Sequence, residues 1–216
     1  MKIAVLGTGV VGINLANKLV AVGHQVRLGS RTENNKAAME WAKKAGASAS
    51  HGTFTDAASF GEIVFNCTNG SHSLEALKQA GERNLNGKTL VDVANPLKFD
   101  GEDMTLFVSN TDSLAEQIQR AFPKAKVVKA LNTVNTVLQV NPTLLKEQHD
   151  IFISGDDPKA KAEVEKILRS FGWKSVIDLG GIKAARGMEA LMLFWLNMYK
   201  THPGTIFNYR IVFGKQ

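Results

Sequence analysis

Cysteine is almost absent from the sequence, since Cys67 is the only one among 216 residues. A single thiol excludes an intramolecular disulfide and is typical of a protein in a reducing compartment. The amino terminus lacks the separate charged, apolar and cleavage regions of a signal peptide, because Met1 and Lys2 lead directly into the apolar segment 3–6. The sequence therefore predicts a cytoplasmic protein.

Long hydrophobic runs are also missing. The most apolar late stretch, residues 191–196, is well short of the roughly 20 residues that span a bilayer. The formal net charge is +6, but lysine and arginine are scattered and form no basic runs with interleaved aromatic residues. We therefore expect neither a membrane nor a nucleic acid as a partner, whereas a cofactor with several phosphates would suit the excess of positive charge.

Two signatures of hydrolytic chemistry are absent as well. Histidine, cysteine and carboxylate residues do not occur at metal-ligand spacing, and the sequence has no nucleophile-elbow motif. The sequence thus predicts neither a metal site nor a hydrolase.

Short β-rich segments alternate with longer segments of helical periodicity, a pattern typical of a parallel sheet covered by helices. Several strand segments are continuously apolar, as burial on both faces of a sheet requires. The predicted strands are residues 2–6, 25–29, 62–67, 89–93, 126–131, 150–154 and 175–178. The predicted helices are residues 10–22, 33–45, 73–82, 113–122, 158–171 and 182–199. We therefore predict an α/β fold with a Rossmann-type, doubly wound and mostly parallel sheet.

The sequence changes character after Gly180. Segment 182–199 is an apolar helix without a clean polar face, and residues 205–212 form a β-rich tail. A helix that is apolar on most sides must be covered, either by packing across the domain or by a dimer interface, and we favour a homodimer. The predicted division is a Rossmann domain at 1–180 and a short C-terminal helix with a tail at 181–216.

The segment after the first predicted strand fits the pattern G-x-G-x-x-G. Alone this pattern is a weak signal, and it can be a glycine-rich turn without a ligand. Here it follows an apolar strand, opens a helix and precedes a second strand, which predicts a dinucleotide-binding turn. Gly7 permits the tight turn, Gly9 lets the backbone approach a pyrophosphate, and Gly12 lets the helix pack on the strand, while the helix amides hold the phosphates. The predicted phosphate loop is Gly7, Thr8, Gly9, Val10, Val11 and Gly12.

The end of the second strand distinguishes NAD from NADP, because an acidic residue there binds a free ribose 2′-hydroxyl and repels a 2′-phosphate. This sequence has no acidic residue there and reads Ser30, Arg31, Thr32. The hydroxyls and the guanidinium can bind the phosphate, and the guanidinium plane can lie on the adenine. The sequence predicts NADP, unless Arg31 is a solvated loop residue that Glu33 occupies.

Polar clusters follow three of the later strands, at the edge where parallel strands line a nicotinamide crevice. They are Cys67, Thr68, Asn69 and His72; Ala94, Asn95 and Pro96; and Asn132 and Thr133. Each can instead be a structural turn or cap. Cys67 fits a buried strand end better than a nucleophile, because no lysine or histidine beside it would lower its pKa. Hydride transfer needs no protein acid or base, but a carbonyl or imine acceptor would need a proton donor, for which His72 is the first choice.

The motifs at residues 3–12, 29–31, 94–97 and 129–133 together resemble the NADP-dependent deazaflavin (coenzyme F-420) reductase family. The resemblance extends to residues 155–157 and 178–181, and so covers nearly the whole chain. Residues 207–212 are similar to the related oxidoreductase domain of the six-transmembrane ferric reductases.

The resemblance implies hydride exchange between NADPH and a flavin-like ring laid against the nicotinamide. By position, it places Thr8, Val10 and Val11 in the phosphate loop, Ser30 and Arg31 at the 2′-phosphate, and Asn69, His72, Ala94, Asn95, Asn132 and Thr133 beside the nicotinamide and acceptor. Deazaflavin-using members tend to have histidine where this chain has Asn132, so a deazaflavin, a flavin and another small molecule all stay open as acceptors.

We therefore predict an NADP-dependent oxidoreductase that transfers hydride between NADPH and a small flavin-like acceptor, with His72 and Asn132 in positioning roles. One alternative is a reductase of small imine or carbonyl compounds. The other is a non-catalytic NADP-binding redox sensor, although a sensor needs no polar floor beneath the nicotinamide.

Overall fold

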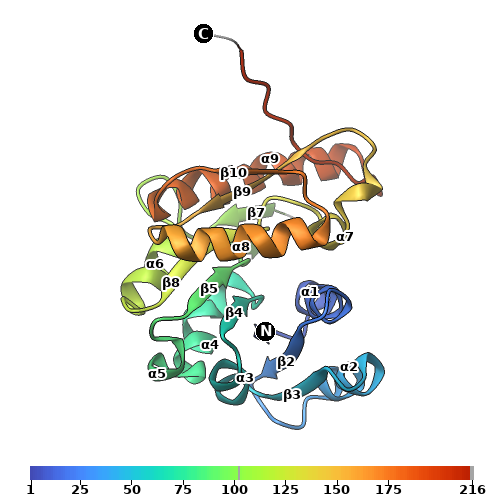
Figure 1. Cartoon of the computed structure of the whole chain (residues 1–216). Coiled ribbons are helices and arrows are strands. Elements are labelled where there is room, and N and C mark those ends of the chain that lie inside the picture. The colour runs from blue at the N-terminus through green and yellow to red at the C-terminus, as the bar shows by residue number, and fades with distance from the viewer. Residues whose placement is uncertain (102, 215–216) are drawn as a thin grey trace.

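The computed structural model describes residues 1–101 and 103–214 and is built around one eight-stranded sheet, shown in Figure 1. The sheet has the order β10-β9-β8-β5-β4-β1-β2-β3. Its strands are β1 (Lys2–Leu6), β2 (Gln25–Ser30), β3 (Ala49–Thr53), β4 (Ile63–Asn66), β5 (Thr89–Asp92), β8 (Lys126–Ala130), β9 (Asp150–Ser154) and β10 (Ser175–Asp178). Among these strands only β8 and β9 pair antiparallel. The predicted α/β, mostly parallel sheet is confirmed.

The strand order explains where a ligand can bind. Read across the sheet, the six neighbouring strands β3, β2, β1, β4, β5 and β8 follow the 3-2-1-4-5-6 order of a Rossmann sheet. This order reverses its winding between β1 and β4 and leaves a crevice there. β9 runs opposite to β8, and β10 runs parallel to β9. The carboxyl ends of β9 and β10 therefore lie at the opposite edge, so that only the first six strands end at the crevice.

Helices cover both faces of the sheet, and each face has its own hydrophobic core. One core joins the sheet to α1 (Val10–Ala21), α2 (Lys36–Ala45), α7 (Thr136–Val140) and α8 (Pro158–Phe171). The other joins it to α3 (Phe54–Phe60), α4 (Ser73–Ala80), α5 (Glu82–Leu85), α6 (Leu114–Ala121) and α9 (Ala185–Thr201). This two-sided burial accounts for the continuously apolar strands.

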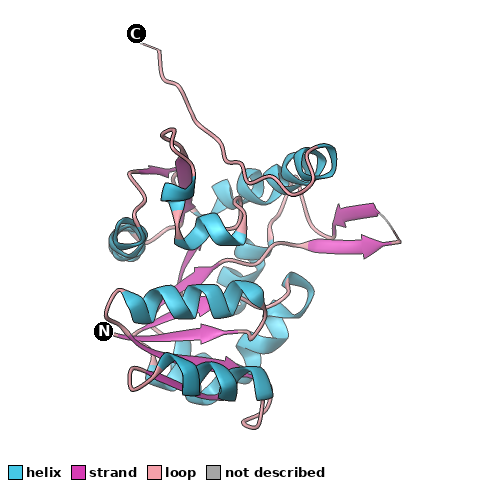
Figure 2. Cartoon of the chain, turned by 90° about the vertical axis from the view of Figure 1, so that its right-hand side faces the viewer, coloured by secondary structure: helices cyan, strands magenta, loops and turns pink. Residues whose placement is uncertain are grey.

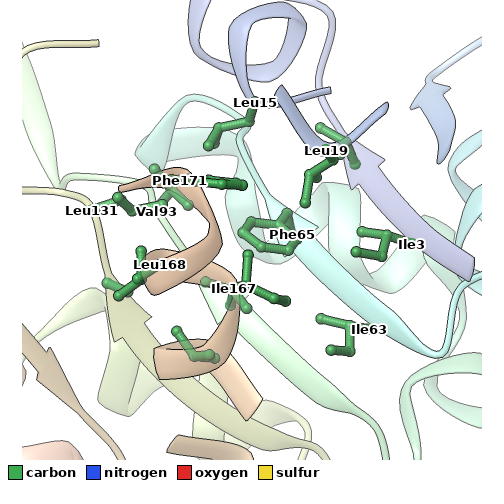
Figure 3. Close-up of a cluster of buried hydrophobic side chains, with 14 of the residues drawn as sticks. Ile3, Leu15, Leu19, Ile63, Phe65, Val93, Leu131, Ile167, Leu168 and Phe171 are labelled. Carbon is green, nitrogen blue, oxygen red and sulfur yellow. The ribbon is translucent and has the colours of Figure 1, made fainter. Parts of the chain in front are cut away.

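The residues of β1 show this division, because side chains alternate between the faces of a strand. Ile3 and Val5 belong to the first core, and Ala4 and Leu6 to the second. Figure 3 shows the first core, where the sheet residues Ile3, Ile63 and Phe65 lie beside Leu15 and Leu19 of α1 and Ile167, Leu168 and Phe171 of α8.

Several elements are not predicted by the sequence pattern. They are β3, α3, α5, α7 and a hairpin of β6 (Leu97–Asp100) and β7 (Asp103–Leu106). The hairpin projects from the body in Figure 2. Its strands and β3 carry few β-branched residues, and α5 and α7 span about one turn each, so that periodicity gives them no clear signal.

The predicted β-rich tail at 205–212 is wrong, because these residues form no strand. They pack against α9 instead, where Phe207 stacks on Trp195 with ring centroids 5.4 Å apart. The tail is hydrogen-bonded to the sheet at the first residue of β9, where the Asp150 amide donates to the Tyr209 carbonyl at 2.9 Å. A strand needs a neighbouring edge along its length, and β-propensity alone does not supply one.

The predicted helix at 182–199 begins as a 3-10 turn (Ile182–Ala184) and continues as α9. Among the helices of the described residues, none combines the length and the apolar character that a bilayer crossing requires.

Candidate functional site

The large cleft, a cavity of about 540 Å³, lies where β1, β2 and β4 end. It brings together residues from the glycine pattern, the end of β2 and the segment after β4. The predicted site residues that line it are Gly7, Thr8, Gly9, Ser30, Arg31, Thr32, Cys67, Thr68, Asn69 and His72.

The glycine turn between β1 and α1 leaves space for a diphosphate. Gly7 has φ +116°, and a Cβ there would lie 2.6 Å from the Cys67 carbonyl oxygen. A Cβ at Gly12 would overlap the Gly7 carbonyl oxygen, so that α1 approaches the strand only because Gly12 has no side chain. A Cβ at Gly9 would meet no protein atom within 4 Å. No side chain caps α1 at Gly9, so the first amides of the helix can bind an anion.

The end of β2 carries the guanidinium of Arg31 and the hydroxyl of Ser30, which is already hydrogen-bonded within the protein. The buried Ser30 hydroxyl donates to the Thr32 carbonyl at 2.5 Å, so that Ser30 shapes the turn and has no second proton for a phosphate. Arg31 is exposed, and no ion pair of the described residues involves either Arg31 or Glu33. Glu33 therefore does not occupy the guanidinium.

The opposite wall of the large cleft is one face of α4. It carries Glu75, Ala76 and Gln79, and His72 of the preceding 3-10 turn (Gly70–His72) continues the spacing of three and four residues that aligns side chains on a helix. The Gln79 amide donates to Glu75 at 3.1 Å. The sequence analysis missed Asn35, Phe54, Glu75, Ala76 and Gln79 in this lining, although helical spacing from His72 would have indicated the last three.

Two further cavities adjoin the large cleft. The strand-end cavity, of about 170 Å³, is lined by Val11, Cys67, Thr68, Asn69, Gly70, Val93, Ala94, Asn95, Leu97 and Phe99. The hairpin cavity, of about 510 Å³, lies between the β6–β7 hairpin, α4 and α6 and includes Leu74, Leu97, Phe99, Phe107 and Leu114. Asn69 borders all three cavities. His72 lines the large cleft and not the strand-end cavity that contains Ala94 and Asn95.

Asn132 lies behind the strand-end cavity and supports it. Its side-chain amide donates to the Asn95 carbonyl oxygen Oδ1 at 2.9 Å and to the Met188 main-chain carbonyl at 3.0 Å. Asn95 donates in return to the main-chain carbonyl of Asn132 at 2.9 Å. The preceding Leu131 has φ +63°, an uncommon conformation for a bulky residue, and Gln139 holds its carbonyl at 2.8 Å.

Some predicted site residues line none of these three cavities. They are Val10, Gly12, Pro96, Asn132 and Thr133. Thr133 is buried, and its hydroxyl has no hydrogen-bond partner among the described residues. Asn132 therefore reaches the cavities only through Asn95.

A buried polar network underlies the strand-end cavity, and the sequence analysis missed it. The Lys129 ammonium lies 2.8 Å from Asp92 Oδ2 and 2.9 Å from Glu189 Oε1, with the three side chains at most 2% exposed. Asp92 Oδ1 also accepts from the Asn66 amide at 2.8 Å. Burial acts to lower the pKa of Lys129, but the two carboxylates outweigh it and hold the pKa above its ordinary value. A lysine between the apolar residues Val128 and Ala130 in the strand was the available signal.

Comparison with known proteins identifies this arrangement. Residues 2–96 match the profile of the family described as NADP oxidoreductase, coenzyme F420-dependent. The F420-dependent NADP reductase of Methanocaldococcus jannaschii is 32% identical in an alignment of 220 positions, which covers 95% of this chain and 96% of that protein.

The chain belongs to this family.

As a member of the family, the chain is an NADP-dependent oxidoreductase, and the resemblance found in its motifs is confirmed. A candidate F420-dependent NADP-reductase from Arthrobacter sp. FB24 has a similar crystal structure, with a TM-score of 0.93 and 44% identity over 99% of this chain and 100% of that chain. The metalloreductase STEAP3 of Rattus norvegicus is 31% identical over 92% of the present chain. The aligned region spans only 38% of the rat protein.

Proposed function

We propose that this protein binds NADPH in the large cleft and transfers hydride between NADPH and a flavin-like acceptor, either a flavin or a deazaflavin. The observation that carries the proposal is that the uncapped amino terminus of α1 at Gly9 and the Arg31 guanidinium, which forms no ion pair with any described residue, both border the large cleft. Together they supply donors for a diphosphate and for a 2′-phosphate. When bound, the cofactor would supply the hydride chemistry.

The protein's own residues bind and orient the reactants. The Val10 and Val11 amides would hold the diphosphate, and Arg31 would hold the 2′-phosphate with Thr32 beside it. The nicotinamide half would then reach the strand-end cavity, where Thr68 and Asn95 present polar groups. His72 lines the large cleft directly before α4, so that we assign it to the dinucleotide and not to proton transfer.

The acceptor would bind in the hairpin cavity, which shares Asn69, Gly70, Leu97 and Phe99 with the strand-end cavity. Its volume of about 510 Å³ is in the usual range for a small-molecule site. Phe99 and Phe107 offer aromatic faces to a planar ring.

We also propose that the chain forms a homodimer in the cytoplasm, through segment 181–216. Phe194 on α9 is 55% exposed, and Val212 and Phe213 of the tail are 80% and 78% exposed. Figures 1 and 2 both show the last described residues projecting from the body. A second copy of the chain would cover these apolar side chains.

The activity is tested by mixing the pure protein and NADPH with flavins, a deazaflavin, ferric chelates and imines while the absorbance of reduced nicotinamide is followed. We expect oxidation with flavin or deazaflavin. Oxidation with imines alone would support a small-compound reductase, and tight binding without oxidation would support a sensor.

Replacement of Arg31 by glutamate tests the cofactor. Loss of a charge-assisted hydrogen bond and gain of a repulsion should raise the Kd for NADPH by about 10- to 100-fold, with little effect on NADH. Calorimetry measures both. The matched control is Arg83→Glu, a substitution on exposed α5 away from the cleft, which should leave both affinities unchanged. If Arg31→Glu weakened the binding of NADPH and of NADH equally, this would contradict the assignment of Arg31 to the 2′-phosphate.

A further inference from the structure

We propose that Lys129, held between Asp92 and Glu189, is a positioning residue that fixes the strand-end cavity around the nicotinamide half of the cofactor. The inference rests on the proposed function and assigns part of it to a group that touches no cavity. It follows from the partners of Lys129 and from the loops to which they lead.

The Lys129 ammonium has three hydrogen-bond donors, and each has an acceptor. Two are the carboxylates of Asp92 and Glu189, and the third is the main-chain carbonyl of Ala94. Glu189 also accepts from the amides of Leu114 and Ala115 at 2.8 and 3.1 Å, at the amino terminus of α6. A buried ammonium with all three donors satisfied holds its partners in one geometry.

Ala94 is held from both sides by this cluster. Lys129 donates to its carbonyl, and its amide donates to Asp92 Oδ1 at 3.3 Å. Ala94 and the following Asn95 line the strand-end cavity. The main chain that borders the cavity is therefore attached directly to an ion pair.

The second wall of the cavity is attached to the same carboxylate. Asp92 Oδ1 accepts from Asn66 at 2.8 Å, and Asn66 Oδ1 accepts from the Thr68 hydroxyl at 2.7 Å. Thr68 lines both the large cleft and the strand-end cavity. Asp92 thus joins the loop after β4 to the loop after β5, and Lys129 of β8 fixes Asp92.

Stability alone does not account for this cluster. Replacement of a buried ion pair by apolar side chains of similar volume is often neutral or stabilising, whereas removal of one partner is costly. A cluster that orients two cavity walls gains a function from its directional hydrogen bonds, which apolar packing would not provide.

The test separates the two halves of the cofactor. The protein with Lys129→Met is titrated by calorimetry with NADPH and with 2′,5′-ADP, which lacks the nicotinamide half, and the fluorescence lifetime of bound NADPH is recorded. We expect the Kd for 2′,5′-ADP to stay within about twofold. The Kd for NADPH should rise towards that for 2′,5′-ADP, and the nicotinamide lifetime should fall towards that of free NADPH.

Three further variants keep the test decisive. Asp92→Asn with Lys129→Met removes two of the three charges and leaves Glu189, which the amides of Leu114 and Ala115 still bind. It should give the same shifts if the single variant does not fold. Lys129→Arg keeps the charge and should restore the lifetime. Glu116→Gln is the matched control, because it weakens a partly buried ion pair between α6 and α9, with Arg186, and Glu116 lines none of the three cavities.

An unchanged lifetime and an unchanged ratio of the two dissociation constants in the folded protein with Lys129→Met, alone or with Asp92→Asn, would overturn the inference. A parallel rise of both constants would also overturn it, because it would indicate a general loosening. A wild-type protein that binds no NADPH would instead contradict the proposed function.

Discussion

The thiol of Cys67 lies where the glycine turn meets the strand-end cavity, since it lines both the large cleft and that cavity. Burial raises the pKa of this thiol, and the carboxylate of Asp92 acts in the same direction. A raised pKa keeps the neutral thiol at physiological pH, and the thiolate is the reactive form. Cys67 therefore contributes shape to the site and not nucleophilic chemistry, as its sequence neighbours had indicated.

We expect Cys67 to react with iodoacetamide far more slowly than an ordinary thiol of pKa about 8.5, and to stay slow as the pH is raised from 7 to about 9. Intact mass measured over time follows the reaction. The urea-unfolded protein is the control and should be labelled rapidly. Equally fast labelling of folded protein would show that the thiol is ionised.

Single residues were predictable where the signal is local. Gly7, Gly9 and Arg31 lie within short motifs, and all three line the large cleft. The cluster of Asp92, Lys129 and Glu189 was not predictable in the same way. Lys129 and Asp92 are 37 positions apart, and Glu189 lies 75 positions from the amide that it caps at Leu114.

At the level of elements, the 3-10 turn Gly70–His72 meets the loop after β5 at a point without spare room. A Cβ at Gly70 would overlap the Asn95 carbonyl oxygen. The two segments that line the strand-end cavity are thus in backbone contact, and the shape of the cavity depends on that contact.

Gly70→Ala should force these segments apart and lower the free energy of unfolding by about 1–3 kcal/mol. The substitution should also weaken the binding of NADPH more than the binding of 2′,5′-ADP. Urea unfolding and calorimetry provide the two measurements. The matched control is Gly187→Ala at an exposed position of α9, where a Cβ meets nothing within 4 Å. This change should be stabilising by about 0.5–1 kcal/mol, because alanine favours a helix. A neutral Gly70→Ala would contradict the close contact.

Elements with signals at both ends were predicted to the residue. α8 begins with Pro158 after the Asp157 cap and ends before Gly172, as the sequence indicated. The prediction of a β-rich tail was wrong because it lacked such local signals. Whether these residues form a strand depends on a sheet edge that is distant in the sequence. β3 and the β6–β7 hairpin likewise depend on partners that the pattern does not contain.

At the scale of the whole molecule, the reversed direction of β9 separates two groups of strands within the sheet. Strands β1, β2, β3, β4, β5 and β8 end at the edge that carries the large cleft, whereas β9 and β10 end at the opposite edge, and β9 binds the tail through Asp150. Segment 181–216 is joined to the core through Glu189 and also exposes apolar side chains. It therefore serves both the internal packing and the proposed dimer.

We expect the wild-type protein to sediment as a dimer at micromolar concentration and the double variant Val212→Asp, Phe213→Asp to sediment as a monomer, because carboxylates would be buried in the interface. NADPH affinity should be unchanged, since neither residue lines the large cleft. Leu144→Asp, at an exposed position outside segment 181–216, is the control. A monomeric wild type would contradict the proposed assembly.

Asn69 borders the large cleft, the strand-end cavity and the hairpin cavity at once. A donor and an acceptor in neighbouring chambers would share this wall and meet each other across it, so that neither has to leave before the other arrives. We therefore expect the protein to react through a ternary complex, with both substrates present together, and not by a shuttle in which the protein itself stores the reducing equivalents.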